Sequence, residues 1–144
     1  MKRLGMGLGI AAIAFVLAVV FLWPGEATGP APIRHGFDAC ARCRMLIGSP
    51  GFGGELRDQH GILTKYDDVG CLLGAMLGSR GEMPDAWVED RDSGTLVPLL
   101  TAQLVHTDGV ETPMGHGIVA FRDEGVARAF VAAQGGALVR LEDV

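Results

Sequence analysis

The longest hydrophobic stretch of the chain lies near its N-terminus, where no charged residue occurs from Leu4 to Trp23. A run of about 20 apolar residues can cross a hydrocarbon core of ~30 Å as a helix. Lys2 and Arg3 precede it, and this positive charge favours a cytoplasmic N-terminus with the remainder exported. We expect residues 1–24 to form a single-pass anchor in the cell inner membrane, with the C-terminal domain in the periplasm. A cleaved signal peptide ending near Gly25-Glu26-Ala27 is the alternative.

Residues 25–39 show no apolar periodicity and contain Pro30 and Pro32. Non-periodic segments with several prolines act as extended linkers. We therefore expect a flexible tether here, followed by a folded domain over residues 40–144.

The first half of that domain predicts short strands and one helix. Residues 55–58 and 62–66 flank a polar turn and predict a hairpin, with further short strands at 42–47 and 86–90. Asp67 or Asp68 offers an N-cap for a helix that ends near Gly78. Its apolar residues recur at helical spacing and are expected to point inward: Val69, Leu72, Leu73, Met76 and Leu77.

The second half repeats this order of elements. Strands are predicted at 102–107, 118–121 and 137–141, and Asp123 caps a helix that ends at Gly135-Gly136. Each half is thus a ββαβ unit, and the fold class is α+β with units at 40–92 and 93–144. Because a domain of either size alone would be marginal, we expect the two units to pack together.

Charge and motifs exclude several classes of function. The chain has 12 Lys+Arg against 17 Asp+Glu, and Lys65 is the one lysine beyond the expected anchor. Nucleic-acid binding needs clustered basic residues, so it is set aside. The sequence contains no Gly-x-Ser-x-Gly, His-Glu-x-x-His or phosphate-loop motif, so we expect no enzyme.

Soft metal ligands gather at two places. Residues 40–45 hold two cysteines and a methionine, and a glycine-rich segment after Pro113 holds a methionine and a histidine. Thiolate and thioether sulfurs select Cu(I), zinc or iron–sulfur centres. In extended backbone, positions i and i+2 share a face. We hypothesise that folding unites both clusters around one Cu(I) ion, and the candidate ligands are Cys43, Met45, Met114, His116 and Cys40.

Other chemistries of the Cys40/Cys43 pair stay open. A structural zinc site needs four ligands, so Cys71 or a histidine would have to complete it. A thiol–disulfide oxidoreductase relies on a helix N-terminus to lower a thiol pKa, and Gly48 and Pro50 make a poor helix opening. A plain disulfide is a third alternative. Cys71 lies opposite the apolar stripe of its helix and is expected to be a packing residue.

The residues that carry these clusters resemble the NosL proteins. The resemblance lies in Cys40-Ala-Arg-Cys43-Arg-Met45, in Tyr66-Asp-Asp-Val-Gly-Cys71 and in Thr112-Pro-Met114-Gly-His-Gly, and it covers nearly all of the expected exported part. NosL proteins are Cu(I)-binding accessory factors for the assembly of nitrous oxide reductase, with a fold of two ββαβ units. The resemblance implies that Cys43, Met45 and Met114 occupy the positions of the family's ligands.

Two departures from the family pattern stand out. The family commonly has glycine at the position of Arg44, so the local backbone is in question. Its members are typically lipoproteins, whereas no cysteine occurs before Cys40 here.

The resemblance implies a membrane-tethered extracytoplasmic metallochaperone that delivers Cu(I) to a copper enzyme, with nitrous oxide reductase as the indicated client. Its partners would be that client, membrane copper-delivery or maturation proteins, and the membrane through the N-terminal helix. The alternatives are a Cys-x-x-Cys thiol–disulfide oxidoreductase and a structural zinc or disulfide adaptor.

Overall fold

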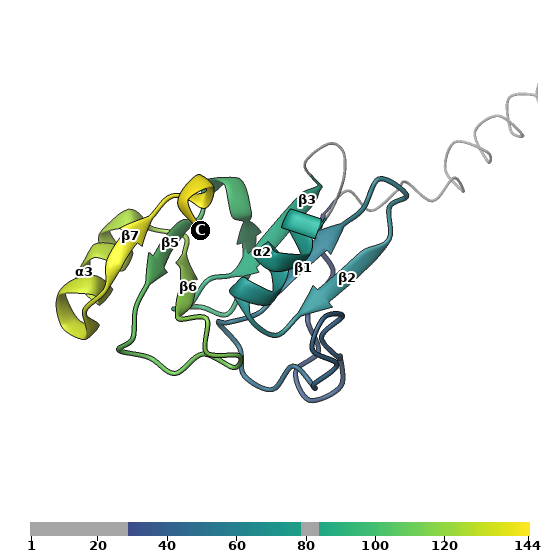
Figure 1. Cartoon of the computed structure of the whole chain (residues 1–144), viewed down its shortest axis with the longest axis horizontal. Helices are drawn as coiled ribbons and strands as arrows, with labels where there is room; N and C mark the ends of the chain where they lie inside the picture. Colours follow the sequence, from purple (N-terminus) through teal and green to yellow (C-terminus); the bar gives the residue numbers. More distant parts are fainter. Residues whose placement is uncertain (1–28, 79–83) are drawn as a thin grey trace, which may run out of the picture.

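Two antiparallel β-sheets lie side by side in the computed structural model, which describes residues 29–78 and 84–144 (Figure 1). The strand order is β2-β1-β3-β4 in the first sheet and β6-β5-β7 in the second. The strands are β1 Gly54–Arg57, β2 Leu63–Tyr66, β3 Asp85–Glu89, β4 Leu96–Pro98, β5 Gln103–His106, β6 Ile118–Phe121 and β7 Ala137–Val139. Short 3₁₀ turns follow at Leu99–Thr101 and Leu141–Asp143.

The two helices have different places in this arrangement. Helix α2, Val69–Gly78, packs against β1, β2 and β6 and so touches both sheets. Helix α3, Glu124–Gln134, covers the second sheet at the outer end of the molecule (Figure 1). The predicted α+β fold is confirmed for these residues, since the elements run β1-β2-α2-β3 and then β5-β6-α3-β7.

The local signals in the sequence place most element ends correctly. The hairpin forms as predicted, with Glu55 opposite Lys65. The Asp123 carboxylate accepts the Val126 N–H at 3.0 Å and caps α3, and Gly135, with φ of 79°, ends it. One inward residue of α2 was predicted wrongly, because Leu77 is 80% exposed in the last turn of the helix.

Two parts of the first unit differ from the sequence prediction. Residues 42–47 form no strand; Leu46 makes one isolated bridge to Ala39. Strand β4 was not predicted, and it pairs with β3 although it follows residue 92, where the sequence divides the units. It is three residues long and ends in Pro98, so it carries almost no periodic signal.

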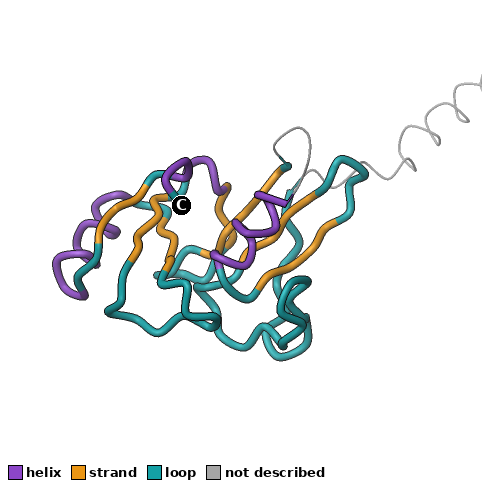
Figure 2. The backbone as a smooth tube through the Cα atoms, viewed as in Figure 1, coloured by secondary structure: helices purple, strands orange, loops and turns teal. Residues whose placement is uncertain are grey.

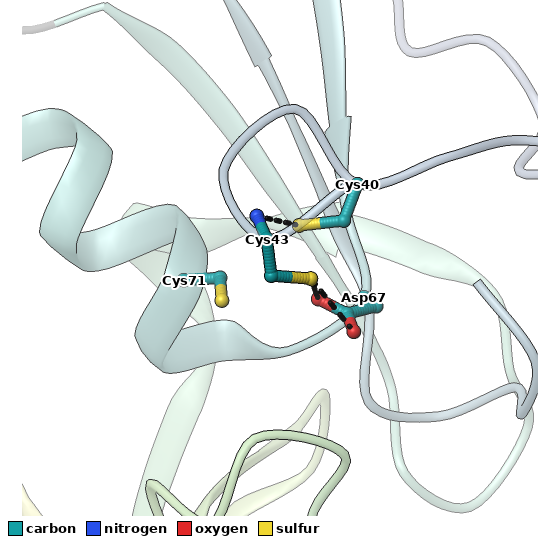
Figure 3. Close-up of side chains that lie close together, drawn as sticks. All are labelled: Cys40, Cys43, Asp67 and Cys71. Carbon is teal, nitrogen blue, oxygen red and sulfur yellow. Dashed lines mark hydrogen bonds between the residues drawn. The ribbon is translucent and has the colours of Figure 1, made fainter. Parts of the chain in front are cut away.

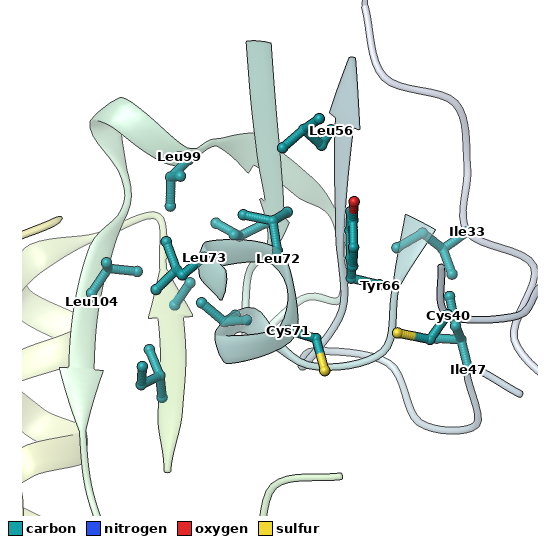
Figure 4. Close-up of a cluster of buried hydrophobic side chains, with 14 of the residues drawn as sticks. Ile33, Cys40, Ile47, Leu56, Tyr66, Cys71, Leu72, Leu73, Leu99 and Leu104 are labelled. Carbon is teal, nitrogen blue, oxygen red and sulfur yellow. The ribbon is translucent and has the colours of Figure 1, made fainter. Parts of the chain in front are cut away.

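One buried cluster joins the two sheets (Figure 4). Leu72 and Leu73 of α2 pack with Leu104 and Ile118 of the second sheet, and all four are at most 6% exposed. Backbone contacts also join the sheets, since the Arg91 N–H donates to the Ala120 carbonyl at 2.7 Å. Each sheet therefore relies on the other to cover its apolar face.

The expected tether is attached to the domain along its described part. The Ala31 N–H donates to the Glu55 carboxylate at 2.7 Å, and Ile33 is 9% exposed. Lys65 Nζ donates to the Pro32 carbonyl at 2.7 Å and to Asp38 Oδ2 at 2.6 Å. These contacts cover the face of the first sheet opposite α2, so residues 31–39 form part of the domain. Residues 25–28 lie outside the described residues.

The predicted membrane anchor, residues 1–24, also lies outside the described residues. Within the ranges 29–78 and 84–144, no helix combines the length and apolar character needed to cross a bilayer.

We predict that Asp38 stabilises this attachment in a pH-dependent way. Hydrogen bonds from Arg34 and then Lys65 hold the pKa of the Asp38 carboxyl well below its usual range. Because the folded-state pKa lies below the unfolded value, the stabilisation is fully present above about pH 4 and is lost as the pH falls further. Asp38→Asn should lower the free energy of unfolding at pH 7 by about 1 kcal/mol, measured by urea unfolding.

The control is Asp92→Asn, which changes an exposed carboxylate of the turn before β4. The difference between wild type and Asp38→Asn should shrink below pH 4. A difference of constant size down to pH 2 would contradict the role of the Asp38 charge.

Candidate metal centre

Three cysteines and one carboxylate gather between the loop of residues 39–46 and the start of α2 (Figure 3). The Sγ atoms of Cys40, Cys43 and Cys71 and a carboxylate oxygen of Asp67 all lie within 4.8 Å of one another. All three thiols are free. Cys43 is half-buried, and the other three residues are at most 2% exposed. This group, called the Cys₃Asp cluster below, has the size and donor types of a metal site.

The loop that carries Cys40 and Cys43 closes on itself. The Cys40 N–H donates to the Met45 carbonyl at 2.8 Å, and the Arg44 N–H donates to the Cys40 carbonyl at 3.0 Å. Arg44 has φ of 67°, in the left-handed region that favours glycine. The expected strand over residues 42–47, with Cys43 and Met45 on one face, is therefore wrong. The turn directs Cys43 to the interior and leaves Met45 52% exposed.

The local surroundings keep the thiols of Cys43 and Cys71 protonated near neutral pH. Cys43 Sγ lies 3.4 Å from both carboxylate oxygens of Asp67. Burial raises the pKa of the Cys43 thiol, and burial together with Cys40 and the Asp67 carboxylate raises that of Cys71 to about 12. A metal ion would have to displace these protons, so metal binding here should strengthen as the pH rises.

The second predicted cluster reaches the same region through Asp68. The Asp68 carboxylate is 0% exposed, and its Oδ2 accepts the Met114 N–H at 3.0 Å. Its Oδ1 accepts the Gly70 N–H at 2.7 Å and lies 3.0 Å from His116 Nδ1. Asp68 thus caps α2 and holds the loop between β5 and β6 against the start of that helix. The loops that carry both clusters lie along one edge of the molecule (bottom of Figure 2).

Two glycines of α2 make this approach possible. A Cβ atom at Gly70 would overlap the ring of His116, and one at Gly74 would overlap the guanidinium of Arg42. Arg42 Nη1 also lies 3.4 Å from the Gly70 carbonyl. The side of α2 without large residues therefore receives one side chain from each ligand-bearing loop, which fixes both loops against the same helix.

Of the five predicted ligands, two belong to the Cys₃Asp cluster and three lie outside it. Cys40 and Cys43 belong to the Cys₃Asp cluster. Met45 and Met114 are 52% and 39% exposed, so their thioethers are accessible from solvent. His116 is held by Asp68 through Nδ1, which leaves Nε2 available; metal-binding histidines commonly have their other ring nitrogen fixed by a carboxylate in this way.

Two members of the cluster, Asp67 and Cys71, were not predicted as ligands. Asp67 was considered as a helix cap, but Asp68 makes the capping hydrogen bond and leaves the Asp67 carboxylate facing Cys43. Cys71 packs in the buried core as expected, and its Sγ also lies within 4.8 Å of that of Cys40. The i, i+4 spacing of Asp67 and Cys71 at the start of a helix is the signal that could have paired them.

These features define a small two-sheet α+β domain with a thiol-rich candidate metal site at its loop edge. The chain belongs to the NosL family, whose model matches residues 32–144. The resemblance found in the sequence is thereby confirmed.

Two known proteins are similar to this chain. The copper-binding lipoprotein NosL of Stutzerimonas stutzeri is 27% identical in an alignment of length 121 that covers 76% of this chain and 63% of that protein. The chain thus spans less than two thirds of that relative's length. The crystal structure of the copper chaperone NosL from Shewanella denitrificans matches with a TM-score of 0.71 at 22% identity, over 84% of this chain and 97% of that one. This second match establishes a shared fold.

We predict that Asp68→Asn releases the Met114 loop from α2. An amide in place of the carboxylate can still accept the Gly70 N–H through Oδ1, but its NH₂ group cannot accept the Met114 N–H. Hydrogen exchange at the Met114 amide should become severalfold faster, measured by NMR or mass spectrometry.

The matched control is Asp123→Asn at the cap of α3, where asparagine caps about as well as aspartate and both the loop and α2 should be unaffected. Equal exchange at Met114 in wild type and Asp68→Asn would show that the carboxylate does not hold the loop.

Proposed function

We propose that this protein is a Cu(I) metallochaperone in which Cys43, Met45 and Met114 bind the ion and His116 is a further candidate ligand. The observation that carries the proposal is the convergence of both soft clusters on two adjacent residues. Asp68 holds the Met114 backbone at 3.0 Å, and its neighbour Asp67 lies 3.4 Å from Cys43 Sγ. Clusters far apart in the sequence are therefore attached to one short segment before α2.

The donor set fits a soft monovalent ion. One thiolate and two thioethers are ligands that select Cu(I) over hard cations. The thioethers carry no proton and no charge, so Cys43 accounts for most of the pH dependence of binding through these three ligands. The similarity to a copper-binding lipoprotein supports copper as the metal.

The exposure of the two methionines fits a protein that passes its ion on. Met45 and Met114 are 52% and 39% exposed, whereas a ligand set meant to retain a metal is usually enclosed. A ligand from a partner protein can thus reach the ion before Cys43 releases it. Such stepwise replacement never leaves the ion without protein ligands.

The proposal extends to the protein that receives the copper and to the cellular location of this chain. We propose delivery to a copper enzyme, with nitrous oxide reductase as the first candidate, and cooperation with membrane copper-delivery or maturation proteins. The uncharged segment from Leu4 to Trp23 supports anchoring in the inner membrane with the domain in the periplasm.

The alternative of a thiol–disulfide oxidoreductase has less support. That chemistry needs a thiol of lowered pKa, commonly at a helix N-terminus. Cys40 and Cys43 lie in a turn, and burial raises the pKa of the Cys43 thiol. A disulfide-exchange assay on metal-free protein should accordingly show little turnover.

We predict that Cys43→Ala and Met114→Ala each weaken Cu(I) binding by at least about tenfold, because even the partners of metal ligands are commonly worth 10–100-fold. The measurement is anaerobic titration against a chromophoric Cu(I) chelator, with an expected stoichiometry near one ion per chain. Met114→Leu, which removes the sulfur but keeps the bulk, should behave like Met114→Ala.

Met76→Leu is the matched control, since Met76 packs against the core cluster from α2. It should bind Cu(I) like the wild type. Unchanged affinity in both the Cys43 and the Met114 variants would refute the proposed function.

A further inference from the structure

The proposed Cu(I) ligands leave most of the Cys₃Asp cluster without a role. Cys40, Asp67 and Cys71 are 1%, 2% and 2% exposed, and the Sγ atoms of Cys40 and Cys71 lie within 4.8 Å of each other (Figure 3). Buried cysteines often serve as small apolar residues. A carboxylate in the same enclosed space needs a different explanation, because burying a charge is costly unless it is paired.

The Asp67 carboxylate is the member of the Cys₃Asp cluster whose surroundings point to a bound cation. Both of its oxygens lie 3.4 Å from Cys43 Sγ, and a thiol is a weak hydrogen-bond donor. Besides burial, the groups that raise the pKa of the Cys71 thiol are Cys40, Asp67 and Asp68, each of which is negatively charged when ionised. Three thiols and a carboxylate thus share one enclosed space with no described cationic side chain among them, and a bound cation would neutralise the carboxylate and any thiolate.

The spacing of the four donors fits a tetrahedral ion. With Zn–S bonds of about 2.3 Å and Zn–O bonds of about 2.1 Å, a tetrahedron places sulfurs about 3.8 Å apart and sulfur and oxygen about 3.6 Å apart. The Cys43–Asp67 separation of 3.4 Å is close to that edge, and all four donors lie within 4.8 Å of one another. Small side-chain shifts would complete the site.

The donor types select the metal. Zinc accepts cysteine sulfur and carboxylate oxygen together in four-coordinate sites, whereas oxygen donors suit Cu(I) poorly. A divalent ion also offsets more of the negative charge of four anionic donors than a monovalent ion does.

We infer that Cys40, Cys43, Asp67 and Cys71 form a closed zinc site that overlaps the proposed copper site at Cys43. The inference rests on the proposed function only for this overlap. Because a thiolate that is shared by two metal ions binds each of them more weakly, zinc and Cu(I) should compete for Cys43. Zinc then occupies the enclosed side of Cys43 until Cu(I) arrives from solvent and recruits the exposed thioethers of Met45 and Met114.

The first test is a zinc titration of the reduced, metal-free full chain against a chromophoric zinc chelator. Wild type should bind one Zn²⁺ per chain. Cys71→Ser and Asp67→Asn should each lower the affinity at least tenfold, and Asp108→Asn, at an exposed loop carboxylate, should not change it. Co²⁺ in place of zinc should give the absorption of a tetrahedral thiolate site in wild type and lose intensity in Cys71→Ser.

The second test separates the two metals. Cys71→Ser should keep wild-type Cu(I) affinity, and Cu(I) added to the zinc-loaded wild type should release one equivalent of zinc. Equal zinc affinity in wild type, Cys71→Ser and Asp67→Asn would overturn the inference. So would a Cu(I) affinity that falls in Cys71→Ser as far as in Cys43→Ala, because the buried sulfurs would then serve copper.

A failure of the proposed function has a different signature, since Cu(I) affinity would be independent of Cys43 and Met114 while zinc binding stayed sensitive to Cys71. Thermal unfolding of the metal-free variants shows which remain folded. Asp67→Asn, nearly identical in shape to the wild-type residue, keeps the test decisive if Cys71→Ser is unstable.

Discussion

One buried carboxylate, that of Asp68, joins the parts on which the site depends. It is fully buried and has as neighbours the Gly70 amide, the Met114 amide and the His116 ring. Without these donors its charge would be costly to bury, so the helix start and the distant loop stabilise the carboxylate together. The same contacts that satisfy Asp68 bring the loop between β5 and β6 to the start of α2, next to Asp67 of the Cys₃Asp cluster.

The fold could be predicted wherever local chemistry decides the structure. The hairpin of residues 54–66, a helix cap at Asp67 or Asp68 and the cap at Asp123 follow from turn and cap preferences that act over a few residues. Strand β4 and the attachment of residues 31–39 depend on partners in other elements: β4 pairs with β3, and Lys65 of β2 binds the carbonyl of Pro32. Such tertiary contacts leave no period in the sequence.

In the candidate site, too, local sequence indicates some features and tertiary contacts decide the others. Cys43, Met45 and Met114 could be named as candidate ligands because soft sulfur side chains are concentrated at two places in the sequence. The turn at residues 40–45 could not, because Arg44 adopts a backbone conformation that its side chain does not favour. Asp67 and Asp68 are adjacent and chemically identical, and only the folded structure shows that one caps the helix while the other faces Cys43.

Cys43 lies at the boundary between an enclosed and an open environment, and this position determines which kinds of donor surround a metal at the candidate site. On one side are Cys40 and Cys71, which are at most 2% exposed; on the other is Met45, which is 52% exposed. Enclosed anionic donors favour retention of an ion, while exposed neutral thioethers favour its exchange. Under the proposed function, the half-buried thiol of Cys43 is the one residue that would serve both retention and exchange. The turn at Arg44 is what produces this arrangement, since an extended strand would have placed Cys43 and Met45 on the same face.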